Sequence, residues 1–417
     1  MQEEPLLTVP SKRKIAIYHQ HLNGGGAVKN VLKLTELFLG DGYEVDLVVH
    51  DRTGSLSSRT PAGVRVIELQ RSTEIVTRIY MLYAATDDID LFSRSMFRSR
   101  KQLDKLLYLP ALTRYLRANR PAILFSNLWQ LAITAITARA CAAPSMPVVG
   151  IFRSAFFTQC AHTMTASKRP RKWRRFLEYC QRVYSRADAI VTVSSGIAQD
   201  LSAIVGIDDS RIRVIHNPVI SDTYAAVIES ELSIELCRPT ENFIVAVGRL
   251  SPEKNFSALI RAFAHLNAHH SLRLIILGEG QQRPALEALC REMGLIGRVE
   301  LPGWVEEPLQ QIHRARLFVS TSLWEGFGNA IVEALSCGCP VVAFDCPHGP
   351  REILDHGRYG KLAAVDDVHG LAQAINSTLA QPPAASYLRR RALDFSESAS
   401  AEGYRRLLTE LLEQRPR

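Results

Sequence analysis

Short apolar, β-branched runs alternate with longer segments of helical spacing along most of the chain. Seven such runs come first: Lys14–Gln20, Tyr43–Val49, Val64–Leu69, Pro121–Asn127, Pro147–Arg153, Ala189–Ser194 and Ile212–Pro218. Six more follow: Phe243–Gly248, Leu272–Gly278, Val299–Gly303, Leu317–Thr321, Cys339–Asp345 and Gly360–Val365. Continuous apolar runs are typical of strands that are buried on both faces. Because helical segments separate them, the pattern predicts parallel sheets covered by helices, and therefore an α/β fold.

The apolar pattern loses its strand character between Val219 and Glu241, and this break divides the two series of runs. A chain of 417 residues is also too long for one ordinary hydrophobic core. We therefore expect two Rossmann-like domains facing a central cleft, with residues 1–220 in the first and residues 221–399 in the second.

The composition is that of a soluble globular protein, with 47% hydrophobic and 22% charged residues. No run of about 18 or more uncharged apolar residues occurs, so no membrane span is predicted. The N-terminal segment starts acidic and lacks the apolar region of a secretory signal, so a cytoplasmic location is expected. The eight cysteines are scattered. The close pair Cys337 and Cys339 has no histidine cluster beside it and is a poor metal site. No metal and no cofactor are expected.

Two basic segments dominate the net charge of +8. Residues 93–120 carry a net charge of +7 and residues 167–188 one of +6, so the positive field lies on the first domain. Within these segments, cations are mixed with apolar side chains: Phe92, Phe97, Leu103 and Leu106 in residues 92–107, and Trp173, Phe176, Leu177 and Tyr179 in residues 168–180. Such a mixture suits a helix on an anionic membrane surface, at the inner face of the cytoplasmic membrane. The alternative is a solvated face whose apolar side packs on the core.

The stretch Leu317–Leu335 has the pattern of a strand, a glycine-rich loop and a helix. Glu325 lies in the loop at the carboxyl end of the strand, where open α/β sheets bind ligands. Glu333 lies about one turn inside the helix, and Asn329 is its expected cap. The backbone amides of Gly326–Ala330 offer a site for an anion. Two carboxylates for sugar hydroxyls and amides for phosphate predict a nucleotide-sugar pocket, although a plain turn with two solvated glutamates is the alternative.

A second loop, which follows the strand Phe243–Gly248, carries two cations. Arg249 offers a planar fork of hydrogen-bond donors, and Lys254 offers a point charge. A diphosphate leaving group needs such a pair of cations. The alternative interpretation is that Arg249 and Lys254 are two unrelated cations on a surface turn.

Both loops resemble sequence signatures of one enzyme family. The segment EGFGNAIVEALSCGCPVVAFD, with Glu325 and Glu333, resembles the E-x7-E signature of retaining glycosyltransferase family 4, and GRLSPEKN resembles its G-R-x-x-x-E-K-N element. The resemblance covers residues 243–365 strongly and residues 14–50 and 187–218 more loosely. It implies a GT-B fold, in which the last helix, here residues from about 400 to 417, crosses back onto the first domain.

The resemblance also implies roles for individual residues. Arg249 and Lys254 are expected to hold the donor phosphates, and Glu325 the hydroxyls of the donor sugar; these three form the expected catalytic set. Glu333 is expected to hold the ribose diol. The full donor-binding set that the resemblance implies is Gly248, Arg249, Lys254, Glu279, Gly303, Glu325, Gly326, Phe327, Gly328, Asn329 and Glu333.

On the first domain, Gly24, Gly25 and Gly26 precede a helix, and the family uses a similar loop near the reacting sugar and the acceptor. The spacing is not G-x-G-x-x-G, so a dinucleotide fingerprint is not supported, and a tight turn without a ligand is the alternative. Arg153 ends a strand on the same side. The chain departs from the family here, because some relatives carry a histidine near this strand end and Ala155 stands in its place. A histidine-based role is therefore in doubt.

The expected activity is that of a retaining, metal-independent glycosyltransferase. It would move a hexosyl unit from a nucleotide diphosphate sugar, with UDP favoured, to a glycan or lipid-linked glycan acceptor in cell-surface polysaccharide or glycolipid synthesis. An epimerase or phosphorylase of the same fold and a basic nucleic-acid-binding protein are the alternatives, although no nucleic-acid-binding signature is present. Asp88 and Asp90 spell D-x-D, the metal–diphosphate motif of another glycosyltransferase fold, but a solvated acidic loop is expected there. His216 is expected to pack or form a hydrogen bond at a strand end.

Overall fold

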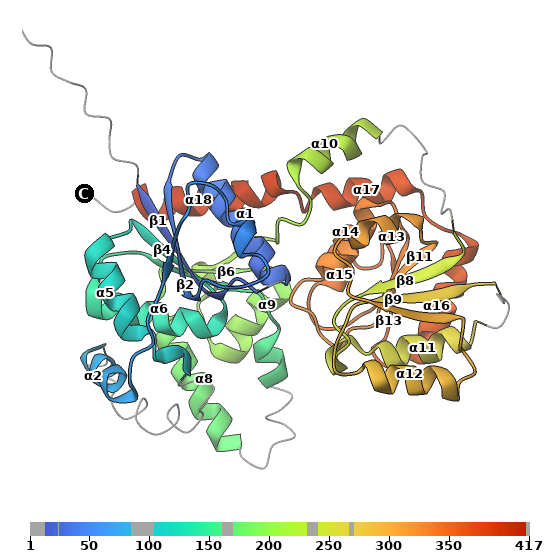
Figure 1. Ribbon diagram of the computed structural model, residues 1–417, viewed down its shortest axis with the longest axis horizontal. Coiled ribbons are helices and arrows are strands. Elements are labelled where there is room, and N and C mark those ends of the chain that lie inside the picture. Colours follow the sequence, from blue (N-terminus) through green and yellow to red (C-terminus); the bar gives the residue numbers. More distant parts are fainter. Residues whose placement is uncertain are drawn as a thin grey trace, which may run out of the picture.

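The computed structural model describes residues 13–23, 25–84, 104–160, 170–231, 241–266 and 271–413. Two parallel sheets organise the chain (Figure 1). The first has the strand order β3-β2-β1-β4-β5-β6-β7. Its strands are β1 Lys14–His21, β2 Glu44–Asp51, β3 Arg65–Glu68, β4 Ile123–Asn127, β5 Val148–Phe152, β6 Ala189–Thr192 and β7 Ile212–Val214. The helices among them are α1 Gly26–Gly40, α2 Glu74–Ala84, α5 Leu109–Asn119, α6 Trp129–Ala142, α8 Pro170–Tyr184 and α9 Ser195–Asp200.

The second sheet has the strand order β10-β9-β8-β11-β12-β13. Its strands are β8 Phe243–Val247, β9 Arg273–Leu277, β10 Val299–Gly303, β11 Leu317–Ser320, β12 Val341–Phe344 and β13 Lys361–Ala363. The helices are α10 Asp222–Glu231, α11 Phe256–Ala264, α12 Arg283–Glu292, α13 Pro308–Arg314, α14 Asn329–Ser336, α15 Pro350–Ile353, α16 Val368–Ala380, α17 Ala385–Leu393 and α18 Glu397–Glu413. The α/β fold with two Rossmann-like units that the sequence predicts is therefore confirmed.

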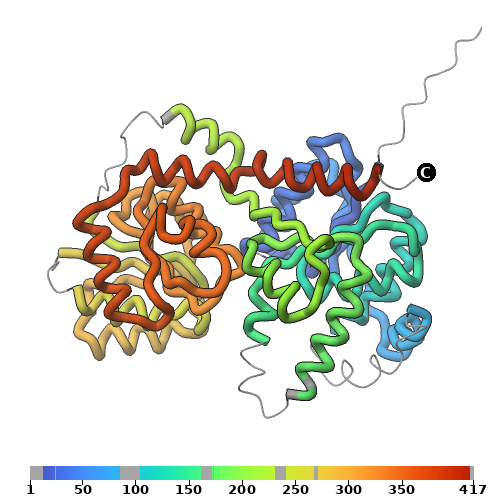
Figure 2. Tube along the Cα trace, turned by 180° about the vertical axis from the view of Figure 1, so that it is seen from behind, coloured from blue at the N-terminus to red at the C-terminus, as the bar shows by residue number. Residues whose placement is uncertain are grey.

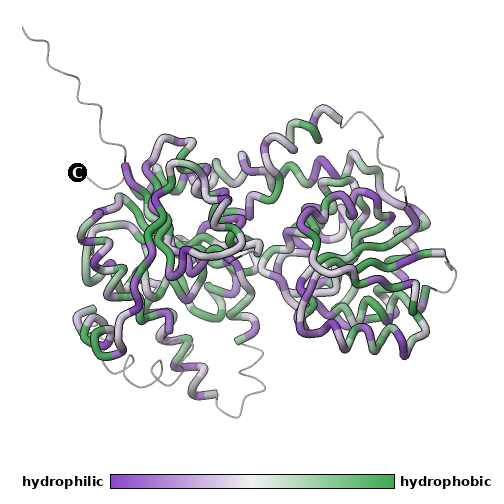
Figure 3. The backbone as a smooth tube through the Cα atoms, viewed as in Figure 1, coloured by the Kyte–Doolittle hydropathy of each residue, from purple (hydrophilic) through white to green (hydrophobic). Residues whose placement is uncertain are grey.

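The central strands are buried because they are apolar on both faces. All five residues of β4 are buried, as are all five of β5. Figure 3 shows the same pattern as hydrophobic strands within a more polar envelope of helices and loops. This burial fixes the register of the ladders. Because the strands are parallel, their carboxyl ends lie at one edge of each sheet.

The chain crosses between the two units twice, and the crossings are hydrogen-bonded to each other. The amides of Val219 and Ile220 both donate to the carbonyl of Phe395, at 3.0 and 3.2 Å. Beyond this point α18 runs back over the first sheet (Figure 2). The ring of Tyr404 in α18 lies 6.2 Å from the rings of Phe38 and Phe125. The last helix therefore completes the core of the first unit.

Helix α8 packs its apolar side into a different hydrophobic cluster from the one that contains Tyr404. Phe176 and Tyr179 are buried, and the ring of Phe176 lies 6.0 Å from that of Trp129 in α6. Arg171, Arg174 and Arg175 of α8 are exposed. The prediction that the aromatic residues of this helix share a lipid-facing surface with its cations is therefore wrong for Phe176 and Tyr179. Both side chains are buried in the core.

Candidate active site

A cleft of about 1000 Å³ lies between the two units, at the carboxyl ends of both sheets. The wall from the first unit includes Gly25, Gly26, Lys29, Asn30, Arg59, Arg153 and Asn217. The wall from the second includes Gly248, Arg249, Lys254, Glu279, Trp304, Glu325, Gly326, Phe327, Gly328, Asn329 and Glu333. Among the described residues, the structure thus brings the predicted donor and acceptor residues to one cleft, with the exception of Gly303. That residue lies behind the surface, where its carbonyl accepts from the amide of Gly278 at 2.8 Å.

The N-terminus of α14 opens into this cleft. Gly328 precedes the helix in the left-handed region, with φ of 109°, and no side chain caps the first turn. The prediction that Asn329 caps this helix is wrong, because Asn329 is the first helical residue and its Oδ1 accepts from Asn217 Nδ2 at 3.0 Å. The amide of Ile331 donates to the carbonyl of Gly328, but those of Asn329 and Ala330 form no hydrogen bond within the described part of the chain. These two amides and the positive end of the helix dipole lie at the cleft, where they can bind an anion.

Lys254 and Glu325 form an ion pair in the cleft. The carboxylate of Glu325 also accepts from the hydroxyl of Ser322, at 2.7 Å, which fixes its orientation. Arg249 is exposed and lines the same wall. Two cations and a carboxylate are therefore grouped beside the N-terminus of α14, as the sequence predicts for a diphosphate and its sugar.

Glu333 lines the cleft one turn into α14 and is half-buried. Burial raises the pKa of its carboxyl group, and the charges of Lys29 and Lys33 partly oppose this effect. No hydrogen bond to this carboxylate is present within the described part of the chain. Its oxygens can therefore accept hydrogen bonds from the hydroxyls of a ligand.

The side chain of Glu279 is held by Arg283, the first residue of the following helix α12. Arg283 donates to it from Nε and from one terminal nitrogen, at 3.0 and 2.7 Å, and these bonds lower the pKa of the carboxyl group. The backbone around it is tightly joined: Leu250 N donates to the carbonyl of Glu279 at 2.9 Å. An added Cβ on Gly278 would lie 1.9 Å from the carbonyl of Gly248. This part of the cleft therefore offers ligands mainly backbone groups.

Arg153 is the centre of a polar chain that sequence reasoning did not predict. Its Nε donates to Asn127 Oδ1 at 2.6 Å, and its guanidinium also donates to Asn217 Oδ1. Burial lowers the pKa of Arg153, and Tyr404 opposes this effect. Behind it, Asn127 Nδ2 lies 3.1 Å from His19 Nδ1, and burial lowers the pKa of His19 to about 4.

The signal for these residues was present but weak. Asn127 and Asn217 each stand at the end of an apolar run, where parallel strands place polar groups on the ligand side. A lone asparagine at a strand end is nevertheless common, so the pattern alone does not distinguish these two residues from turn residues.

The glycine loop before α1 comes close to the donor helix. An added Cβ on Gly26 would lie 3.5 Å from Asn329 Nδ2. Gly24 lies outside the described residues, as do Asp88, Asp90 and residues 92–103, so the structure places none of these predicted residues.

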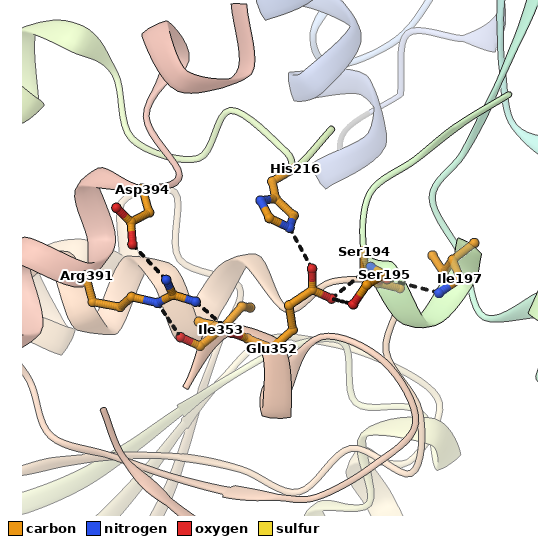
Figure 4. A network of polar contacts seen from close by, with 9 residues as sticks. Ser194, Ser195, Ile197, His216, Glu352, Ile353, Arg391 and Asp394 are labelled. Carbon is orange, nitrogen blue, oxygen red and sulfur yellow. Dashed lines mark hydrogen bonds and ion pairs between the residues drawn. The ribbon is translucent and has the colours of Figure 1, made fainter. Parts of the chain in front are cut away.

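Glu352 joins the two units at the side of the cleft (Figure 4). One oxygen lies 2.7 Å from His216 Nε2, and the other accepts from the amide and hydroxyl of Ser195, at 2.9 and 2.8 Å. Burial works against ionisation of Glu352, but these hydrogen bonds outweigh it and lower the pKa. His216 thus forms a hydrogen bond at a strand end, as expected from the sequence.

Two family models match this chain. The one for glycosyl transferases group 1 matches residues 228–395, and the one for glycosyltransferase family 4 matches residues 24–223. Each covers one of the two Rossmann-like units, so the family assignment extends to both sides of the cleft.

Curated relatives match part of their length. The N-acetylgalactosamine-N,N'-diacetylbacillosaminyl-diphospho-undecaprenol 4-alpha-N-acetylgalactosaminyltransferase of Campylobacter jejuni is 32% identical over 197 residues, which are 47% of this chain and 52% of that protein. The lipopolysaccharide core biosynthesis glycosyltransferase LpsE of Rhizobium meliloti is 30% identical over 230 residues, or 54% of this chain and 65% of that protein. The chain thus spans about half to two thirds of the length of these relatives.

Solved structures share the fold over nearly the whole chain. Anabaena Alr3699/HepE in complex with UDP has a TM-score of 0.68 at 19% identity, with 95% of this chain and 100% of that chain covered. The apo form of the lipopolysaccharide outer core galactosyltransferase WaaB has a TM-score of 0.67 at 18% identity, with 95% and 99% covered. These likenesses establish the two-domain architecture.

Within the described ranges, no helix is both long and apolar enough to cross a membrane.

Proposed function

Because the chain belongs to the glycosyltransferases of group 1 and family 4, we propose that it is a retaining, metal-independent hexosyltransferase. The donor is a nucleotide diphosphate sugar, and the acceptor is a glycan or a lipid-linked glycan. The observation that carries the proposal is the grouping of Arg249, Lys254 and the uncapped N-terminus of α14 in one cleft.

This grouping suits the charge that develops during transfer. As the bond between C1 of the sugar and the leaving oxygen breaks, negative charge grows on the diphosphate. Fixed cations and backbone amides that already point at this position stabilise the charge without having to reorganise. Arg249, Lys254 and the first amides of α14 fill this role. We assign no metal to the site, since the two cations supply the positive charge.

The two carboxylates hold the rest of the donor. Glu325 lies beside Lys254 and is oriented by Ser322, so its oxygens are placed to accept from sugar hydroxyls. Glu333 lies further along α14 and is assigned to the ribose diol. UDP is the proposed nucleotide, and a neighbour in the fold, Alr3699/HepE, was solved in complex with UDP and with UDP-glucose.

The first unit forms the acceptor side, through Gly25, Gly26 and Arg153. We propose that the acceptor is a glycan on a membrane-bound lipid and that the enzyme works at the inner face of the cytoplasmic membrane. Two relatives support this part of the proposal, because one is named for a diphospho-undecaprenol substrate and the other for lipopolysaccharide core biosynthesis. The exposed cations of α8 belong to the basic segment of residues 168–180.

A thermal-shift screen with UDP-, GDP- and ADP-sugars tests the donor. A bound sugar nucleotide at about 100 times its Kd should add about 2.7 kcal/mol of stability. The preferred donor is then given to the enzyme with lipid-linked glycans, and the anomeric configuration of the product is determined by NMR. Binding of no sugar nucleotide, or a product of inverted configuration, would contradict the proposal.

A further inference from the structure

Helix α2 exposes an unusually apolar face. Of the ten large hydrophobic side chains that are exposed among the described residues, five belong to this helix. They are Ile75, Val76, Ile79, Leu82 and Tyr83, with exposed fractions of 73, 38, 47, 55 and 78%. Ile75, Ile79 and Leu82 follow one another at intervals of four and three residues, so they share one side of the helix. An exposed apolar stripe of this kind marks an interaction surface.

The other side of α2 is already used for packing. Thr77 and Met81 are buried, and the helix contacts α5 and α6. The apolar stripe therefore cannot reach the core without breaking this packing. What covers the stripe must come from outside the described fold.

The neighbourhood of α2 identifies the chemistry of the partner. Helix α8 packs against the same helix, α6, and presents Arg171, Arg174 and Arg175 to solvent. Helices α2 and α8 both lie at the lower end of the first unit in the views of Figures 1 and 2. Apolar groups and cations at one end of the unit match the two layers of an anionic bilayer, whose acyl chains take the apolar groups and whose headgroups take the charges. A second copy of this chain is disfavoured, because pairing the stripes would bring two sets of like charges together.

We propose that α2 is the element that inserts into the membrane. Ile75, Ile79 and Leu82 enter the boundary between headgroups and acyl chains, while the arginines of α8 bind the lipid phosphates. This assignment differs from membrane docking through the basic segments alone. Helix α2 supplies the apolar contact with the lipid, which the buried aromatic residues of α8 cannot supply, and no cation of α2 is needed for it. The biological role of this membrane insertion rests on the proposed membrane-bound acceptor. The binding measurement that tests the insertion requires no enzymatic turnover.

The test is flotation with vesicles of phosphatidylglycerol and of phosphatidylcholine, in low and high salt. The full chain should bind the anionic vesicles, and binding should fall as salt rises. The double variant Ile75→Glu/Ile79→Glu should lose binding about tenfold or more, because it places two carboxylates in the apolar layer. Ile296→Glu is the matched control, since Ile296 lies in the second unit and is also 73% exposed. It should bind as the unmodified protein does.

Three outcomes would overturn the proposal: no binding by the unmodified protein, binding by the double variant at full strength, or equal loss in the Ile296→Glu control. Sedimentation of both proteins without lipid covers a further case. If the unmodified protein self-associates and the double variant is monomeric, the stripe is a contact between copies and the membrane assignment fails. Thermal shift with UDP reports whether the variant is folded and whether its cleft is intact. Failure of the membrane-insertion proposal can therefore be distinguished from failure of the glycosyltransferase proposal.

Discussion

Asn217 Nδ2 donates a hydrogen bond of 3.0 Å to Asn329 Oδ1, and this bond joins the first unit to the first residue of α14. Asn217 also accepts from Arg153, which in turn donates to Asn127 at the end of β4. The amides that we assign to the donor phosphates are thus connected, through one arginine, to the acceptor side of the cleft. We expect this chain to set the angle at which the donor meets the acceptor.

Replacement of Asn329 by alanine tests this role. The variant removes the bond between the units but leaves the contact between Arg153 and Asn217 intact. A misplaced donor should lower kcat by about 10²-fold, while the affinity for the donor nucleotide changes little. Steady-state kinetics and nucleotide titration measure the two effects. A variant with unchanged kcat would show that the bond has only a structural role.

Arg249 and Lys254 should act mainly in the transition state. Removal of one preorganised electrostatic partner typically lowers kcat by about 10²–10³-fold. Arg249→Ala should do so without loss of stability, because Arg249 is exposed and its side chain forms no hydrogen bond or ion pair within the described part of the chain. Lys254→Ala should also disturb Glu325, its ion-pair partner. Kinetics and thermal unfolding of both variants separate these effects, and an unchanged kcat/KM would remove the residue from the phosphate site.

Transfer should persist in EDTA. This expectation follows from the proposal that Arg249 and Lys254 neutralise the diphosphate. The measurement is sugar transfer before and after exhaustive treatment with the chelator. If activity disappears and Mg²⁺ or Mn²⁺ restores it, the metal-independent mechanism is wrong, and Asp88 and Asp90 become candidates for a metal site.

Glu333 should make stability depend on pH in the absence of donor. Burial raises its pKa, so the folded protein holds this proton more strongly than the unfolded chain does. Its contribution to stability is therefore fully present below the usual glutamate pKa of about 4.3 and is lost as pH rises through the higher folded value. Glu333→Gln should unfold at a higher temperature than the unmodified protein at pH 7, and the difference should shrink toward acidic pH.

The same variant should bind the donor nucleotide less well, since an amide replaces the carboxylate that accepts from the ribose hydroxyls. Thermal unfolding at several pH values and nucleotide titration at pH 7 check the two halves of this prediction. Equal stability of both proteins at every pH would contradict the assignment of a burial cost to Glu333.

The fold and the donor loops were predictable because their signals are local. Buried parallel strands are continuous apolar runs, and the loops around Arg249 and Glu325 follow such runs directly. The polar chain through Arg153 was not predictable. Arg153 lies 26 residues from Asn127 and 64 residues from Asn217 along the chain, and only the strand order of the folded sheet brings them together.

Helices were harder to interpret than strands. In α8 the aromatic residues are next to arginines in sequence, yet the helix directs Phe176 and Tyr179 into the core and its cations into solvent. In α2 the reverse holds, since its core contact is made by Thr77 and Met81 while isoleucines remain exposed. Sequence spacing shows that such a helix has two sides, but the neighbouring elements decide which side is covered.

The contact of α18 with the first unit has a consequence for synthesis of the protein. Tyr404, Leu407 and Leu408 share one hydrophobic cluster with Phe38 and Phe125, although more than half of the chain separates the two groups. A ribosome that has finished the first unit's strands has therefore not yet made the helix that covers them. The second unit, whose strands end at Ala363, is complete before α18 emerges. The first part of the protein to be translated is thus the last to close its core, and until then its exposed apolar surface favours aggregation.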